Sequence, residues 1–182
     1  MKRTRARLIF ALLLATMTIA LLLPLERAWL TLAKLVLRAK FSDVRQITPG
    51  ALDRWLSDTN RPAPLLLDVR QHAEFAVSRI AGARRIDPQA NVAVELFPAL
   101  PADQPVIVYC AVGYRSCKIA RRLQAAGITN VFNLEGAIFA WASEGRPIEN
   151  DDGATKRVHP FNWIGKQLLS PEHRADATSL QH

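Results

Sequence analysis

The segment from Cys110 to Ser116, Cys-Ala-Val-Gly-Tyr-Arg-Ser, carries the residue types needed for nucleophilic chemistry. A cysteine thiolate is a strong nucleophile, and its pKa, about 8.5 in the free residue, falls near cations and helix N-termini. Gly113 lets backbone N–H groups of the loop approach the sulfur, and Arg115 adds a permanent cation with a planar set of donors. The segment therefore predicts a reactive thiolate beside an anion-binding loop.

The flanking sequence places this segment at a turn between a strand and a helix. Val106 to Tyr109 is a short β-branched run, whereas residues 118–126 have helical character and end before Gly127. At such a turn the first N–H groups of the helix lack partners, and the helix dipole favours negative charge. We interpret Ser116 as the N-cap of this helix; the alternative is a hydroxyl that donates to the sulfur.

Four motifs resemble, in their order, those of the rhodanese (sulfurtransferase) family, and the resemblance extends from Ser42 to Pro147. They are a strand ending in Asp-x-Arg (65–70), Glu-Phe followed by Ile-x-Gly-Ala (74–83), the Cys110 loop, and a final strand with glycine and tryptophan (130–141). Family members often have His at position 79, Pro at 81 and Gly at 135, where this chain has Arg, Ala and Glu. The differences at positions 79 and 81 remove no group that the chemistry needs.

The resemblance implies a sulfurtransferase that requires no cofactor. The Cys110 thiolate would take the sulfane sulfur of thiosulfate or a persulfide and pass it, as a Cys110 persulfide, to cyanide or a thiol. Arg115 would bind the anionic donor, and Asp68 and Arg70 are interpreted as a supporting ion pair. The remaining residues expected to bind substrate belong to the same loop: Ala111, Val112, Gly113, Tyr114 and Ser116. No metal site is expected, because the four histidines are scattered.

Other functions stay open at this point. A non-catalytic scaffold or redox-responsive binding module, tethered to a membrane, is the main alternative. A cysteine phosphatase or arsenate reductase is disfavoured, because those relatives have one more residue between the cysteine and the arginine of the loop. Cys117 is interpreted as a packing residue rather than a resolving thiol, because Cys117, Ala120 and Leu123 share one helical face.

The pattern of elements predicts an α/β fold, in which helices cover both faces of a parallel sheet in a rhodanese-like domain over residues 42–148. Strands are expected at 65–69, 106–109 and 131–133, and helices at 48–55, 74–77, 90–97, 118–126 and 137–143. In such sheets ligands bind beyond the carboxyl ends of the strands, where Cys110 lies.

The N-terminal part predicts a membrane anchor. Residues 1–7 form a basic flank, and the uncharged run 8–25 can just cross a hydrocarbon core of about 30 Å. A cleaved secretory signal is the alternative, although no good cleavage site follows the run. Residues 26–41 are expected to form a basic amphipathic helix, lying at the membrane interface or packed on the domain. We expect a single-pass protein of the cell membrane, with the side that bears the domain left open.

The net charge of +8 does not indicate nucleic-acid binding, because the basic residues form no stripe interleaved with aromatic residues. Those near the apolar run are better explained by membrane headgroups. The tail, residues 149–182, changes composition and is expected to be partly disordered. Its apolar residues between Phe161 and Leu169 are expected to pack on the domain, lie on the membrane or contact a protein partner.

Overall fold

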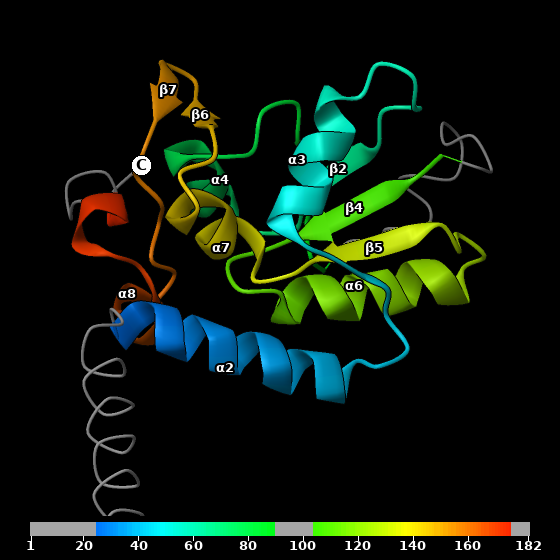
Figure 1. Ribbon diagram of the computed structural model, residues 1–182, viewed down its shortest axis with the longest axis horizontal. Coiled ribbons are helices and arrows are strands. Elements are labelled where there is room, and N and C mark those ends of the chain that lie inside the picture. Colours follow the sequence, from blue (N-terminus) through cyan, green and yellow to red (C-terminus); the bar gives the residue numbers. More distant parts are fainter. Residues whose placement is uncertain (1–24, 90–103, 176–182) are drawn as a thin grey trace, which may run out of the picture.

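The computed structural model describes residues 25–89 and 104–175, and a parallel sheet lies at its centre (Figure 1). The order of the strands across the sheet is β1-β5-β4-β2-β3, and all neighbouring pairs are parallel. Their bounds are β1 Gln46–Ile47, β2 Leu65–Asp68, β3 Arg84–Arg85, β4 Val106–Tyr109 and β5 Val131–Leu134. The predicted parallel α/β architecture is confirmed.

Helices pack on both faces of this sheet. Figure 1 shows α3 and α7 above the strands and α6 below them, with α2 running along the lower edge of the molecule. The helices are α2 Leu25–Lys40, α3 Pro49–Ser57, α4 His72–Val77, α6 Tyr114–Ala125, α7 Ala137–Ser143 and α8 Trp163–Leu168. A hairpin of β6 Ile148–Asn150 and β7 Gly153–Thr155 and the short 3-10 helix η1, Pro171–His173, complete the described chain.

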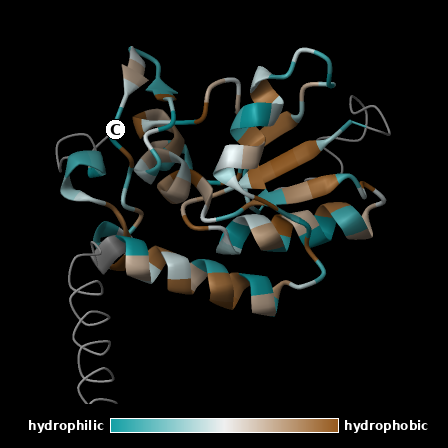
Figure 2. Ribbon diagram, viewed as in Figure 1, coloured by the Kyte–Doolittle hydropathy of each residue, from teal (hydrophilic) through white to brown (hydrophobic). Residues whose placement is uncertain are grey.

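The residues of the central strand β4 explain why helices cover both faces of the sheet. Its four residues are fully buried, and they alternate between two hydrophobic clusters. Ile107 and Tyr109 pack with α3 and α7, whereas Val106 and Val108 pack with α6. Figure 2 shows the same strand as a continuous hydrophobic segment. A strand without a polar face needs a layer on each side, and this fixes the position of its carboxyl end, where Cys110 follows.

The start of α6 differs from the sequence-based prediction. The helix begins at Tyr114, and Gly113 is its N-cap, with φ +113°. The interpretation of Ser116 as the N-cap is therefore wrong, because Gly113 adopts a left-handed conformation that lets the chain turn directly into the helix. By contrast, α3 has the predicted cap, in which Thr48 Oγ1 accepts a hydrogen bond from Ala51 N–H and Pro49 follows. The predicted helix 90–97 lies outside the described residues.

The structure describes the N-terminal region from residue 25 onward and the C-terminal tail up to residue 175. The predicted helix 26–41 corresponds to α2, whereas the predicted membrane span 8–25 lies outside the described residues apart from Leu25. Among the helices of the described part, none is both long and apolar enough to span a bilayer. The tail forms β7, α8 and η1, and buried Val158 and Leu169 join the core of the domain. Disorder was expected only past Pro171, and the described residues end at 175, so most of that prediction lies outside them.

Candidate active site

The Cys110 sulfur lies in the turn between β4 and α6, surrounded by polar donors. The N–H of Gly113 donates to Cys110 Sγ at 3.2 Å, and the Ser116 hydroxyl donates to it at 3.5 Å. Both donors belong to the turn itself or to the first turn of α6. The Cys110 residue is only 1% exposed, so the thiol lies at the floor of the loop. Ser116 thus takes the second role considered for it, that of a hydroxyl donor.

The shape of the loop depends on close packing around Gly113. A Cβ at this position would lie 3.3 Å from both Leu37 Cδ1 of α2 and Asn133 Nδ2 of β5. The start of α7 holds the other side of the loop, because Ile138 N–H donates to the Cys110 carbonyl at 3.2 Å and Phe139 N–H to the Ala111 carbonyl at 3.1 Å. Three elements distant in sequence therefore fix the backbone that surrounds the sulfur.

Arg115 is held by a carboxylate from another part of the chain. Its two terminal nitrogens donate to Glu74 Oε2 and Oε1 of α4, both at 2.7 Å. Burial raises the pKa of Glu74, but the hydrogen bonds and charge of Arg115 lower it by more, so the pKa lies below its ordinary value of 4.5. Burial lowers the pKa of Arg115, while Glu74 and the nearby Cys110 raise it by more. Arg115, which was predicted to bind the anionic sulfur compound, therefore already has two of its N–H groups bonded to Glu74.

Asp68 and Arg70 form a buried ion pair below the loop. Arg70 Nη2 donates to Asp68 Oδ2 at 2.6 Å and also to the Ser78 carbonyl, and neither side chain of the ion pair is exposed. The charge is desolvated, and among the described residues Arg70 Nη1 has no hydrogen-bond partner. The pair ties the end of β2 to Ser78, the residue after α4.

Cys117 and the other loop residues complete the site. Cys117 is fully buried in the cluster around α6, and burial raises its pKa to about 11. Its predicted packing role therefore matches its position. Ala111 is buried and Val112 is partly buried, whereas Tyr114 is exposed and contacts Phe41 edge-to-face. The structure places all seven residues of the loop together but turns Tyr114 outward.

The family follows from a match that covers more than half of the chain. The model of the Rhodanese-like domain matches residues 48–144, from the cap of α3 to the end of α7. The chain belongs to the rhodanese family. The match includes the Cys110 loop, Glu74 and the Asp68–Arg70 pair, whereas α2 and the C-terminal segment from β6 to η1 lie outside it.

Some relatives of this rhodanese domain are named after sulfur transfer, and others are tRNA uridine(34) hydroxylases. A sulfurtransferase of Allochromatium vinosum is 34% identical over 110 residues, which cover 60% of this chain and 99% of that protein. A probable adenylyltransferase/sulfurtransferase MoeZ of Mycobacterium tuberculosis is 34% identical over 101 residues, but these are 56% of this chain and only 25% of that protein. The crystal structure of the Alr3790 protein from Anabaena superposes with a TM-score of 0.53 at 25% identity, over 57% of this chain and 91% of that one.

Some neighbours of the site were not identified as functional residues from the sequence. Glu74 was noted only as part of a motif, and nothing in its spacing predicts a partner 41 residues away. From the tail, the Phe161 ring lies 4.5 Å from the Arg115 guanidinium. His159 is also near, because the charges of Glu74, Arg70 and Arg115 influence its pKa, which burial lowers overall. The C-terminal segment, which lies outside the family match, therefore borders the Cys110 loop.

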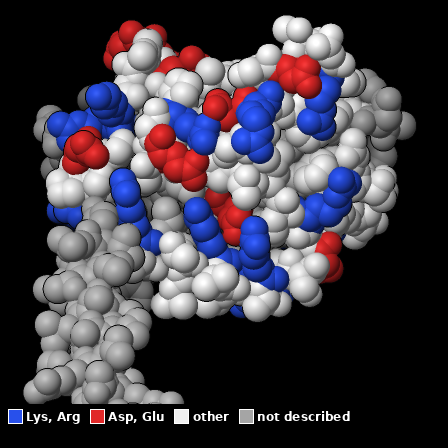
Figure 3. Space-filling model, viewed as in Figure 1, with Lys and Arg blue, Asp and Glu red and all other residues white. Residues whose placement is uncertain are grey.

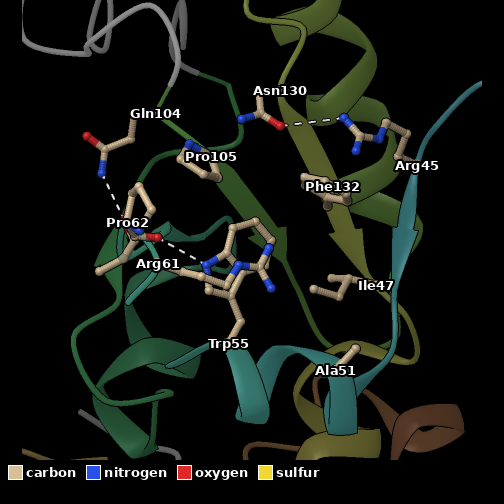
Figure 4. Close-up of a pocket in the computed structure, with 11 residues that line it drawn as sticks. Arg45, Ile47, Ala51, Trp55, Arg61, Pro62, Gln104, Pro105, Asn130 and Phe132 are labelled. Atoms are coloured by element: carbon tan, nitrogen blue, oxygen red, sulfur yellow. Dashed lines mark hydrogen bonds between the residues drawn. The ribbon is translucent and has the colours of Figure 1, made fainter. Parts of the chain in front are cut away.

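A cleft lies at the opposite end of the strands from Cys110, near the amino ends of β4 and β5. It has a volume of about 980 Å³, and Figure 4 shows its aromatic and arginine side chains. Arg61 lies over the Trp55 ring at 4.0 Å and Arg45 over the Phe132 ring at 3.9 Å. Neither of the two cysteines lines this cleft.

Proposed function

We propose that this rhodanese domain transfers sulfane sulfur through a persulfide on Cys110. The observation that carries the proposal is the pair of donors on the sulfur, Gly113 N–H at 3.2 Å and Ser116 Oγ at 3.5 Å, at the carboxyl end of the central strand. A terminal persulfide is an anion, like the thiolate that precedes it. Donors fixed by the loop stabilise negative charge without having to reorganise during the reaction.

In the first step, the Cys110 thiolate attacks the outer sulfur of thiosulfate. The new bond joins Cys110 Sγ to that sulfur, the sulfur–sulfur bond of thiosulfate breaks, and sulfite leaves with the electron pair. The total charge is unchanged, because a thiolate and a dianion become a persulfide anion and a dianion. No oxidant, metal or cofactor takes part in this displacement.

In the second step, a nucleophilic acceptor attacks the terminal sulfur of the Cys110 persulfide. With cyanide the products are thiocyanate and the Cys110 thiolate, and with a thiolate they are the acceptor's persulfide and the Cys110 thiolate. The enzyme returns to its starting form after each pair of displacements. We therefore expect ping-pong kinetics.

We assign Arg115 a positioning role in addition to its charge. The fork of its guanidinium is engaged by Glu74, and this pair joins the start of α6 to α4. The guanidinium also lies close enough to Cys110 for the sulfur to raise its pKa. Arg115 thus holds the loop in place while contributing a positive charge that is partly compensated by Glu74.

The direct test is the mass of the intact protein after incubation with thiosulfate and removal of the excess. We expect a gain of one sulfur atom on Cys110, reversed by cyanide with release of thiocyanate. Cys117→Ala should retain the gain, and Cys110→Ser should lose it. A parent protein that gains no sulfur from thiosulfate or from an organic persulfide would contradict the proposal.

A non-catalytic binding module is the second candidate, and one observation favours it. Cys110 is 1% exposed, so a donor reaches the sulfur only if side chains around the loop move. This alternative expects a protein partner that is retained equally well by the parent chain and by Cys110→Ser. Sulfur loading of the parent chain would exclude a purely structural role for Cys110.

We further propose that the protein is held at a membrane. The support comes from sequence: the run 8–25 has no charged residue, it follows a basic flank, and it leads directly into α2. After cell fractionation, the full chain should stay in the membrane pellet after alkaline carbonate treatment. Release by carbonate would contradict an integral anchor.

A further inference from the structure

We infer that the rhodanese domain lies flat on an anionic lipid bilayer, through an apolar face formed by α2 and α8. This inference concerns a surface outside the active site, and it would hold even if Cys110 transferred no sulfur. It also goes beyond anchoring by the run 8–25, because an anchor alone allows the domain to move freely above the membrane. We call this surface the α2/α8 face: Trp29, Leu32, Leu35, Val36, Trp163 and Ile164.

Helix α2 has two apolar sides with different surroundings. Leu30 is buried against the domain, and Leu37 is partly buried on the same side. At about 100° per residue, the four α2 members of the α2/α8 face occupy an arc of about 120° on the opposite side of the helix. Each of them is at least 50% exposed. An isolated soluble domain has no reason to place a second apolar stripe there, since one stripe already holds the helix to the core.

Helix α8 extends this surface from a distant part of the sequence. It packs against α2, and Figure 1 shows it beside the first turns of that helix. Trp163 is 76% exposed and Ile164 is 51% exposed. Buried Gly165 anchors the helix, because a Cβ at this position would lie 2.0 Å from the Pro160 carbonyl oxygen. The close packing at Gly165 thus holds α8 against the domain and leaves its two largest apolar side chains in solvent.

Basic residues border the apolar stripe. Helix α2 contains four basic residues and one acidic residue, and its basic members are Arg27, Lys34, Arg38 and Lys40. Figure 3 shows basic side chains along the part of α2 that borders the rest of the domain, and an uncharged surface along its lower edge. Arg27, Arg38 and Lys40 are all exposed. Arg38 also bonds to Glu135, and Lys40 Nζ lies 5.1 Å from the centre of the Tyr114 ring. Tryptophan and an apolar arc with basic edges match the interfacial region of a bilayer with anionic headgroups.

The bilayer is a better occupant than a second copy of the chain. The uncharged run 8–25 ends at the first residue of α2, so a membrane reached by this run would lie next to the α2/α8 face. A symmetric pairing of two such faces would bring the basic edges of the two α2 helices together, and like charges at close range oppose association. An anionic lipid surface, by contrast, attracts these basic residues.

Spin labels can measure whether the α2/α8 face enters lipid. The full chain, in a Cys110→Ser and Cys117→Ala background, would be reconstituted in vesicles of phosphatidylcholine and phosphatidylglycerol. One label would replace Leu32, Val36 or Trp163, with a control label at Ser57 in α3. We expect the three labels to become accessible to dissolved oxygen and protected from a water-soluble nickel chelate. The label at Ser57 should stay accessible to the chelate.

Three results would overturn the inference. The first is continued access of the chelate to the labels at Leu32 and Val36 while the chain floats with the vesicles, which would show an anchor without docking. The second is a chain that does not float with the vesicles. The third is protection of the labels from both reagents with dipolar broadening between chains, which would indicate a second copy. Sulfur loading, measured on the parent chain, is independent of all three.

A charge variant tests the electrostatic part. Arg27→Gln should lower the ratio of docked to undocked label about fivefold on vesicles with phosphatidylglycerol, because one basic residue near an anionic surface contributes on the order of 1 kcal/mol. The change should vanish on vesicles of phosphatidylcholine alone. Arg61→Gln, at the opposite edge of the domain, is the matched control and should leave the ratio unchanged. An equal effect of both variants would contradict the assigned orientation.

Discussion

The two ends of the sheet differ in how their arginine side chains are paired and in how open they are. At the carboxyl end, around Cys110, arginines are paired with carboxylates, as in Arg115–Glu74 and Arg70–Asp68, and the thiol is almost inaccessible. At the amino end, a cleft of about 980 Å³ is open, and Arg45 and Arg61 lie on aromatic rings without forming an ion pair among the described residues. Under the proposed function, the chemistry takes place at the closed end of the sheet and not in the open cleft.

The reason lies in the direction of the strands. In a parallel sheet every strand ends at the same edge, and each return to a helix brings free N–H groups to that edge. The Cys110 loop receives the Gly113 N–H directly on the sulfur. The amino edge is where helices end and strands begin, so the free backbone groups of the helices there are carbonyls rather than N–H groups. Substitutions at the two ends of the sheet should therefore differ in the property that they change, sulfur loading or stability, and in the size of the effect.

The largest expected effect is at the buried ion pair of the carboxyl end. Asp68→Asn leaves the Arg70 guanidinium buried without a counter-charge, and we expect the free energy of unfolding to fall by about 3–5 kcal/mol. Urea denaturation followed by circular dichroism measures the change. A loss below 1 kcal/mol would show that the pair does not support this edge. A double variant, Asp68→Asn with Arg70→Met, should recover part of the loss.

The next effect concerns the pair that holds the loop. Glu74→Gln should lower stability by about 1.5–3 kcal/mol at neutral pH, because hydrogen bonds to a charged group are lost, and it should reduce sulfur loading. The folded pKa of Glu74 is below 4.5, so its contribution is complete above that value and is lost as pH falls through the folded pKa. The parent and the variant should therefore converge in acid. A constant difference across the pH range would contradict this.

A smaller effect is expected at the second cysteine. Cys117→Ala removes a buried sulfur from the core and should cost about 1 kcal/mol, with sulfur loading retained. In the parent chain the pKa of about 11 keeps Cys117 protonated near neutral pH, so iodoacetamide should modify it only after unfolding. Peptide mapping after alkylation measures both cysteines. Rapid modification of Cys117 in the folded chain would mean that the α6 cluster opens.

The smallest effect should come from the amino end. Arg45→Met removes a guanidinium stacked on Phe132, and we expect a loss of about 0.5–1 kcal/mol with unchanged sulfur loading. The same thiosulfate assay and urea titration apply. A strong loss of sulfur loading would mean that the two ends of the sheet are coupled, and the contrast between them would fail.

The sequence was informative where chemistry and local pattern agree. The bounds of β4 follow from a β-branched run that leads into Cys110, and the cap of α3 follows from Thr48-Pro49. The start of α6 was predicted too late, because Tyr114-Arg115-Ser116 has no strong helix signal and Gly113 resembled an ordinary loop residue. Local patterns cannot reveal the Arg115–Glu74 pair, which depends on the packing of α4 against the loop.

The tail shows a second limit of local patterns. Its strands have three residues each and α8 has six, and periodicity is not readable over such lengths. What orders the segment is the burial of Val158 and Leu169 in the core built by α7, an interaction that exists only after folding. The apolar residues of the tail were recognised from the sequence, but not the division between those that anchor it and those that face outward.

The contact between Leu37 and Gly113 has a mechanical consequence. Helix α2 packs directly on the residue whose amide donates to the Cys110 sulfur, since a Cβ on Gly113 would lie only 3.3 Å from Leu37 Cδ1. A displacement of α2 would therefore change the space around Gly113. We expect it to change the environment of the thiol as well.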